Sequence, residues 1–132
     1  MAGPLLYLDS SAIVKLVVPE PETKALRELL WSWPERVSSV VARIEVERVA
    51  RRISGGAVRR ARTVMSRLAL VELDNDVVQV ASALEPPTLR ALDAIHLATA
   101  VSLGEDLGAL CAYDFRLGAA ATSMAIEVHA PA

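Results

Sequence analysis

Two acidic residues directly follow short apolar runs, at positions where carboxylates can bind a metal ion. Asp9 follows the run of residues 5–8, and Asp114 follows the run of residues 109–113. Each run has the length and composition of a buried strand. Parallel strands bring their carboxyl ends to one edge of a sheet, where ligands bind in open α/β folds. We therefore expect Asp9 and Asp114 to lie at the same edge.

Two further acids fall on predicted helices. Glu45 lies early in a helix expected over residues 41–53, and helical side chains lean toward the helix N-terminus, which directs Glu45 to the same edge. Asp93 lies in the first half of a helix expected over residues 88–103, which is apolar nearly all round and therefore predicted to be buried. A buried carboxylate needs a partner. Arg90, three residues earlier, is the one basic residue within helical reach.

Four carboxylates at one sheet edge predict a site for a hard divalent cation. Oxygen ligands suit Mg²⁺ or Mn²⁺, whereas Zn²⁺ prefers histidine or cysteine. One or two such ions can activate water and stabilise the leaving oxygen of a phosphodiester. The predicted chemistry is metal-dependent hydrolysis of a phosphodiester, without a nucleophile from the protein.

The segment of residues 36–67 is basic in a chain whose net charge is −2. It holds nine arginines and two acids, and therefore carries +7. Carboxylates alone would repel a polyanion, so we expect arginines of this segment to hold the phosphates of a nucleic acid. The candidates are Arg43, Arg48, Arg51 and Arg52. A solvated face, or contact with an acidic protein partner, is the alternative use.

Apolar runs that alternate with helical patterns predict one α/β domain over residues 1–132. The predicted strands are residues 5–8, 36–40, 70–73, 109–113 and 124–129. The predicted helices are residues 12–18, 22–33, 41–53, 57–70, 77–84, 88–103 and 115–121, with Gly55 and Gly56 ending the third. Short, nearly all-apolar strands in this setting form a parallel sheet that is covered on both faces.

The composition favours a protein with a full hydrophobic core and no membrane span. Hydrophobic residues make up 53% of the 132 residues, and the one cysteine, Cys111, is expected to be a small buried hydrophobe. Asp9 and Lys15 interrupt the first apolar stretch, and no positive charge precedes it. This pattern fits neither a spanning helix nor a secretory signal, so we expect a cytoplasmic protein.

Each candidate acid also has a purely structural interpretation. Asp9 could cap a helix, a role that Ser10 or Ser11 could also take. Glu45 could pair with Arg43 or Arg48, and Asp114 could be a turn residue paired with Arg116.

The remaining polar and aromatic candidates are interpreted in structural terms. His96 is expected to be a packed histidine that hydrogen-bonds to a neighbour rather than a metal ligand. Trp31 and Trp33 are expected in the core or at a partner interface.

Four motifs together resemble the PIN-domain family, and more narrowly the VapC toxins of bacterial toxin–antitoxin pairs. They are L-D-S-S-A-I-V-K-L at 8–16, S-S-V-V-A-R-I-E at 38–45, L-D-A-I-H-L-A-T-A at 92–100 and A-Y-D-F-R-L at 112–117. The first and third motifs are the most specific. The resemblance covers nearly the whole chain, with the motifs in the family's order and spacing.

The resemblance implies a three-layer α/β/α fold around a mainly parallel sheet and an Mg²⁺- or Mn²⁺-dependent endoribonuclease. It implies tRNA or ribosomal RNA as substrate, a VapB-type antitoxin as partner, and a homodimer. Asp9, Glu45, Asp93 and Asp114 match the family's acidic cluster. Ser10 matches the small hydroxyl residue that helps to order water at the metal.

Three other functions are weighed against the toxin. A phosphoryl-receiver domain also uses aspartate and Mg²⁺ at strand ends, but it needs a late lysine, and no lysine follows Lys24. A binding module with the same fold and no activity is disfavoured by the intact acids. A PIN-domain nuclease that processes RNA or acts on DNA, and is not a toxin, remains the main alternative.

Overall fold

The central feature of the computed structural model is a five-stranded parallel sheet in the order β3-β2-β1-β4-β5, and the structure describes residues 3–132. The strands are β1 (Leu5–Leu8), β2 (Arg36–Ser39), β3 (Ala69–Val71), β4 (Leu107–Cys111) and β5 (Val128–His129). Every neighbouring pair is parallel. The predicted α/β fold is confirmed.

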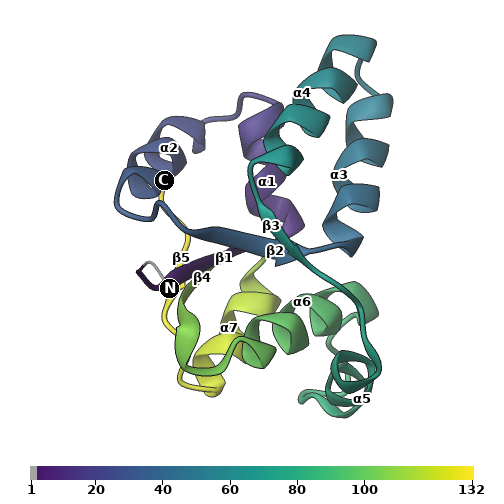
Figure 1. The fold of residues 1–132 in the computed structure, drawn as a ribbon, viewed down its shortest axis with the longest axis vertical. Coiled ribbons are helices and arrows are strands. Elements are labelled where there is room, and N and C mark those ends of the chain that lie inside the picture. The colour runs from purple at the N-terminus through teal and green to yellow at the C-terminus, as the bar shows by residue number, and fades with distance from the viewer. Residues whose placement is uncertain (1–2) are drawn as a thin grey trace.

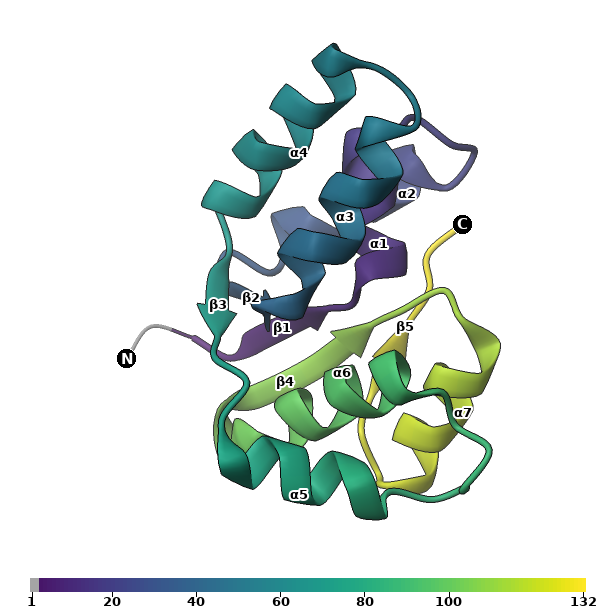
Figure 2. The same cartoon turned by 90° about the vertical axis from the view of Figure 1, so that its right-hand side faces the viewer.

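Within residues 3–132, seven α-helices and one short 3-10 helix connect these strands. They are α1 (Ser10–Val17), α2 (Thr23–Trp31), α3 (Val41–Arg51), α4 (Gly55–Ser66), α5 (Asn75–Ala83), α6 (Ala91–Ser102), η1 (Gly104–Asp106) and α7 (Phe115–Ser123). Helices α1 to α4 cover one face of the sheet, and α5, α6 and α7 lie on the other (Figures 1 and 2). Among the described residues, no helix has the length and apolarity that a membrane crossing requires.

Alternate residues of the strands fill the two cores on either side of the sheet. Leu6 and Leu8 of β1 pack with α1 to α4, whereas Tyr7 packs with α6 and α7. This alternation follows from the pleat, which sends successive side chains to opposite faces. Burial on both faces explains why the strands are apolar without a period of two. Cys111 is buried in the first core, as predicted.

The chain reverses its direction of strand addition between β1 and β4. From β1 it adds β2 and β3 on one side, and then returns to add β4 and β5 on the other. Ligand sites in such sheets lie in the crevice beyond the carboxyl ends of the strands at this switch point. Asp9 and the segment that leads to Asp114 leave the sheet at this place.

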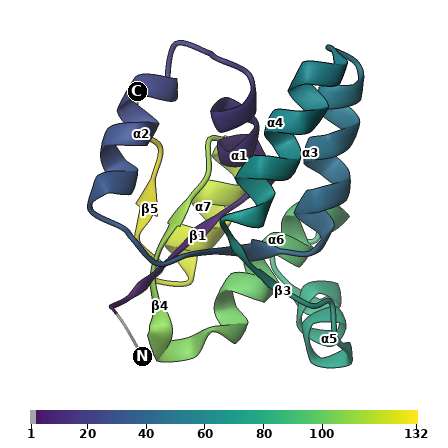
Figure 3. The ribbon, with the colours of Figure 1, turned by 45° about the horizontal axis from the view of Figure 1, so that its top comes forward.

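One local prediction was wrong and another is narrowed. Gly55 and Gly56 do not end α3 but begin α4, because the Ser54 hydroxyl accepts a hydrogen bond from the Ala57 N–H and caps that helix. Trp31 is 85% exposed, which leaves a partner interface as its predicted environment, whereas Trp33 is partly buried against the core. Helices α3 and α4 form a hairpin in which they lie side by side (Figure 3).

Gly108 in β4 tests the packing that fixes the strand leading to Asp114. A Cβ at this position would lie 2.5 Å from Cζ3 of Trp33 and 2.9 Å from Cβ of Pro4. We expect Gly108→Ala to lower the free energy of unfolding by about 1–3 kcal/mol, because overpacking displaces the ring or the strand. Urea denaturation measures this change.

Gly118→Ala is the matched control. Gly118 lies within α7, and a Cβ there would meet its nearest atom, Cγ1 of Val128, at 3.6 Å. This substitution should be neutral or stabilising by about 0.5–1 kcal/mol, because alanine favours helix over glycine. Equal destabilisation by both substitutions would contradict the packing argument.

Candidate functional site

Asp9 joins the end of β1 to the start of α1. Its side chain caps the helix by accepting a hydrogen bond from the Ala12 N–H at 3.0 Å. The Ser11 hydroxyl lies 2.7 and 2.9 Å from the two carboxylate oxygens of Asp9, so the predicted cap at Ser10 or Ser11 was wrong. Ser11 also accepts a hydrogen bond from the Tyr113 N–H, which ties this turn to the segment after β4.

The environment of Asp9 disfavours its charged form. The residue is 3% exposed. Burial raises the pKa of Asp9 to about 6, against the hydrogen bonds from Ser11 and Ala12, and the charge of Asp93 raises it further. A bound cation would favour the charged form of Asp9, so this buried carboxylate is suited to bind one.

Glu45 lies at the centre of a hydrogen-bonded network that links the two helical layers. Its Oε1 accepts from the Ser10 hydroxyl and lies 2.7 Å from Nε2 of His96. The other ring nitrogen of His96 lies 2.7 Å from the Tyr7 hydroxyl. His96 is therefore a packed, hydrogen-bonded histidine, as predicted. Glu45 pairs with α6 and α1, so the alternative that paired it with Arg43 or Arg48 was wrong.

These contacts keep Glu45 ionised. Burial alone would raise the pKa of Glu45, but hydrogen bonds from His96 and Ser10 together outweigh it, and the pKa is lowered. The network also orients the carboxylate, because two elements from opposite sides of the sheet hold one oxygen.

Asp114 caps α7 rather than following β4 directly. Strand β4 ends at Cys111, and the Asp114 Oδ1 accepts a hydrogen bond from the Leu117 N–H at 2.9 Å. Its ion-pair partner is Arg90, at 3.2 Å, and not the predicted Arg116. The residue still lies beyond the carboxyl end of the strand, as the sequence pattern required.

Asp93 lies in the first turn of α6 and is half-buried. The prediction that α6 is buried all round was wrong at its start, since Leu92 is 47% exposed. Asp93 lies 3.6 Å from the Arg90 guanidinium. Burial, and next the charge of Asp114, raise the pKa of Asp93.

The four acids share one electrostatic neighbourhood. Asp93 feels the charges of Asp114 and Glu45, and Asp9 feels the charge of Asp93. A hollow of about 490 Å³ opens here, and Ser10, Glu45 and Asp114 line it. Asp9 and Asp93 are not among its lining residues.

The donor chemistry fits a hard divalent cation, although the carboxylates do not converge on one point. Among residues 3–132, no group of three histidine, cysteine, aspartate or glutamate side chains is arranged to hold a metal ion. Each carboxylate is instead turned toward a partner within the protein, such as Ser11, His96 or Arg90. The residues fit in charge and donor type, because oxygen ligands that disfavour each other's ionisation are relieved by a cation.

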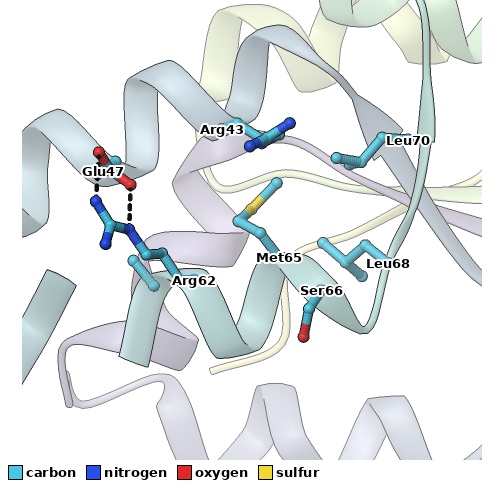
Figure 4. Close-up of a pocket in the computed structure, with 8 residues that line it drawn as sticks. Arg43, Glu47, Arg62, Met65, Ser66, Leu68 and Leu70 are labelled. Atoms are coloured by element: carbon cyan, nitrogen blue, oxygen red, sulfur yellow. Dashed lines mark hydrogen bonds and ion pairs between the residues drawn. The ribbon is translucent and has the colours of Figure 1, made fainter. Parts of the chain in front are cut away.

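The predicted phosphate-binding arginines spread around α3 and do not share one face, and Arg43, Arg48 and Arg51 border a common hollow. Arg48 and Arg52 follow Glu45 by three and seven residues, which places them on its face of the helix. Arg43 lies on the other side, next to Met65 and Leu70, where a hollow of about 410 Å³ separates α3 from the end of α4 (Figure 4). The ion pair between Glu47 and Arg62 closes one end of that hollow. Arg51 is exposed and lines hollows beside Arg48.

Sequence reasoning missed three contributors to this site. Ser11 and Tyr7 hold Asp9 and His96, respectively, and neither has a distinctive spacing that would reveal the contact. Lys15 lines the hollow, pairs with Glu20 and Glu22 at 3.0 Å and lies over the Tyr113 ring. Lys15 lies one and a half turns after the start of α1, and this spacing was the one feature of the sequence that could have placed it near the site.

Comparisons with known proteins find similar sequences along nearly the whole chain. A family model described as PIN domain matches residues 6–121. Ribonuclease VapC46 of Mycobacterium tuberculosis is 49% identical over 126 residues, which span 96% of this chain and 97% of the relative. Ribonuclease VapC47 of the same species is 38% identical, over 86% of this chain and 87% of its own length.

Two solved structures share the fold. A toxin–antitoxin complex from Klebsiella pneumoniae contains a chain with a TM-score of 0.75 at 22% identity, covering 96% of this chain and 98% of that one. The crystal structure of Mycobacterium tuberculosis VapC20, a sarcin–ricin loop cleaving toxin, gives a TM-score of 0.70 at 18% identity, covering 87% and 94%. At these identities the likeness shows the fold alone.

Asp9→Asn should make the protein more stable at neutral pH. The folded-state pKa of Asp9 is about 6, above its ordinary 3.8, so ionisation opposes folding above that pH. Asparagine keeps the helix cap without the charge. We expect a gain of about 1–3 kcal/mol in the free energy of unfolding at pH 8, in the presence of a chelator. The gain should shrink as the pH falls through 6 and vanish below about 4, where the aspartate is protonated in both states.

Asp74→Asn provides the control for urea denaturation across this pH range. Asp74 is also a helix cap, accepting from the Val77 N–H at 2.9 Å, but it is exposed. Its substitution should change stability by less than about 0.5 kcal/mol at each pH. A gain for Asp9→Asn that is absent at pH 8, or that persists unchanged at pH 4, would refute the electrostatic argument.

Proposed function

The chain belongs to the PIN-domain family, within its VapC ribonucleases, and on that premise we propose that it is the toxin of a bacterial toxin–antitoxin pair, a metal-dependent endoribonuclease. The observation that carries the proposal is the position of Asp9, Glu45, Asp93 and Asp114 at the switch point of the sheet. Burial and the charges of Asp114 and Glu45 raise the pKa of Asp93 there, and burial and the charge of Asp93 raise that of Asp9. The order of the strands explains why the acids lie at this edge of the sheet. Their negative charge explains why a bound cation would stabilise them.

Asp9, Glu45, Asp93 and Asp114 would hold the metal, which we take to be Mg²⁺ or Mn²⁺ because all four ligands are hard oxygens. Such an ion supplies Lewis-acid activation of water and of the phosphodiester when bound. This chain's own residues then orient the reactants. Ser10 lines the hollow beside Glu45, where its hydroxyl can hold a water for attack.

His96 acts through Glu45 as a positioning residue. Its ring is buried and is held from behind by the Tyr7 hydroxyl, so Nε2 has one fixed direction, toward Glu45 and Ser10. A carboxylate held in this way needs little rearrangement before it binds a ligand, and preorganisation of this kind is a large part of catalysis. His96 itself lies too deep to touch an RNA strand.

RNA is the substrate that the relatives' name, ribonuclease, supports, and structured RNA such as tRNA or ribosomal RNA is the class we propose. Arg48 and Arg52 share the face of α3 that carries Glu45, so a strand whose phosphodiester lies at the acids can pass over both guanidinium groups. Arg43 and Arg51 lie farther round the helix from Glu45, so we expect them to contribute less to phosphate binding.

We also propose an antitoxin partner and a homodimer. The toxin–antitoxin complex that shares this fold supports the first. Exposed apolar side chains supply surface for both, and Ile44 and Leu73 line a hollow of about 640 Å³ with Arg43, Arg48 and Arg51. A partner with apolar and acidic side chains fits this hollow. Co-purification with the protein of the adjacent reading frame and light scattering of the isolated chain test the two assemblies.

Loss of either of two acids should abolish cleavage. We expect Asp9→Asn and Asp93→Asn to lower the rate on a labelled structured RNA by at least about 100-fold, as for removal of a main electrostatic contributor. Asp76→Asn, at an exposed aspartate of α5, should leave the rate unchanged. A chelator should stop the wild-type reaction, and Mg²⁺ or Mn²⁺ should restore it. Undiminished cleavage by both variants would exclude this site. Cleavage of DNA of the same sequence at equal rate would favour a nuclease that acts on DNA.

The two arginines nearest Glu45 should dominate the salt dependence of RNA binding. We expect Arg48→Gln and Arg52→Gln each to reduce the slope of log affinity against log salt by about 0.7–0.9, the value for one lost phosphate contact. Filter binding with the Asp93→Asn protein avoids cleavage during the measurement. Arg27→Gln, at an exposed arginine of α2, is the control for loss of charge alone. An equal reduction of the slope in all three variants would contradict the proposed path of the RNA over Arg48 and Arg52.

A further inference from the structure

Arg90 connects two of the candidate metal ligands. Its Nη2 lies 3.2 Å from Oδ2 of Asp114, and its Nε lies 3.6 Å from Oδ2 of Asp93. The two acids begin different helices, since Asp93 is in the first turn of α6 and Asp114 caps α7. One guanidinium therefore spans the gap between them.

The contacts occupy the oxygens that a cation would need. Oδ1 of Asp114 already accepts from the Leu117 N–H, and Arg90 contacts Oδ2, the oxygen that remains for a cation. Asp93 uses Oδ2 in the same way. The charge of Arg90 also offsets the mutual repulsion of the two acids, which otherwise raises the pKa of Asp93. Arg90 and a divalent ion thus compete for the same atoms.

Solvent weakens the interaction of Arg90 with the two acids. The Arg90 side chain is 69% exposed, and ion pairs at such exposure contribute little to stability. The backbone of Arg90 is fixed, because its carbonyl accepts from the Ala94 N–H at the start of α6. A released guanidinium therefore stays beside the acids, at the end of a flexible stem, and its planar fork suits a phosphate.

We propose that Arg90 is an exchangeable counter-ion of the site: it neutralises Asp93 and Asp114 until a divalent cation binds there, and its freed guanidinium then binds a phosphate of the RNA. This inference rests on the proposed nuclease function. It assigns one residue two opposite effects, since Arg90 weakens metal binding and strengthens substrate binding.

Calorimetric titration with Mn²⁺, in the absence of RNA, tests the first effect. We expect Arg90→Gln to bind Mn²⁺ about two- to fivefold more tightly than the wild type, the range that corresponds to loss of an exposed ion pair. Arg116→Gln is the matched control, because Arg116 is exposed, lies two residues after Asp114 and forms no ion pair within the described part of the chain. It should change Mn²⁺ affinity by much less. Arg90→Lys keeps the charge and should bind Mn²⁺ nearly as the wild type does.

Steady-state cleavage at saturating Mn²⁺ tests the second effect. Arg90→Gln should raise KM for RNA at least threefold, whereas Arg116→Gln should leave it unchanged. Affinity for Mn²⁺ that is unchanged or weaker in Arg90→Gln, or equal in the two variants, would overturn the proposal, as would an unchanged KM. If the wild type binds Mn²⁺ and cleaves RNA while Arg90→Gln matches the control, the counter-ion role fails and the nuclease function stands. A wild type that neither binds Mn²⁺ nor cleaves RNA removes the nuclease function itself.

Discussion

Negative charge held at the switch point of a parallel sheet is the constraint on which the rest of this structure depends. Four carboxylates from four elements lie within electrostatic range, and burial together with mutual repulsion raises the pKa of Asp9 and Asp93. The protein offsets this with hydrogen bonds from Ser11, a histidine against Glu45 and one arginine across two acids. All these contacts come from side chains close to the site. The layers on either side of the sheet can therefore be packed with apolar side chains.

The structural and functional interpretations of these acids are not alternatives. Asp9 and Asp114 both cap helices, and each caps with Oδ1. A helix N-terminus favours a carboxylate, which fixes the residue in place and leaves its second oxygen available for another partner. Capping thus explains how the chain holds two acids at a fixed position on the sheet edge before any ligand arrives.

Much of this architecture could be predicted from the sequence, because it depends on local pattern. Short apolar runs predicted the strands, and acids after those runs predicted which residues gather at one edge. The errors lie where tertiary packing decides. Leu92 of α6 is half-exposed although that helix is apolar nearly all round, and β4 stops two residues before the end of its apolar run. The partners of Glu45 were missed because Ser10 and His96 are distant from it in sequence. The apolar spacing within a helix does not indicate which residues of other helices it contacts.

The order of the acids along the chain has a consequence for when the set can be complete during synthesis. Asp9 leaves the ribosome early, but Asp114 follows it by more than a hundred residues, and the strand that precedes Asp114 pairs with β5 at Val128–His129. Any N-terminal fragment that ends before Asp114 lacks one of the four candidate ligands. A nascent chain therefore carries an incomplete acidic set until β4 and the turn that follows it have been synthesised.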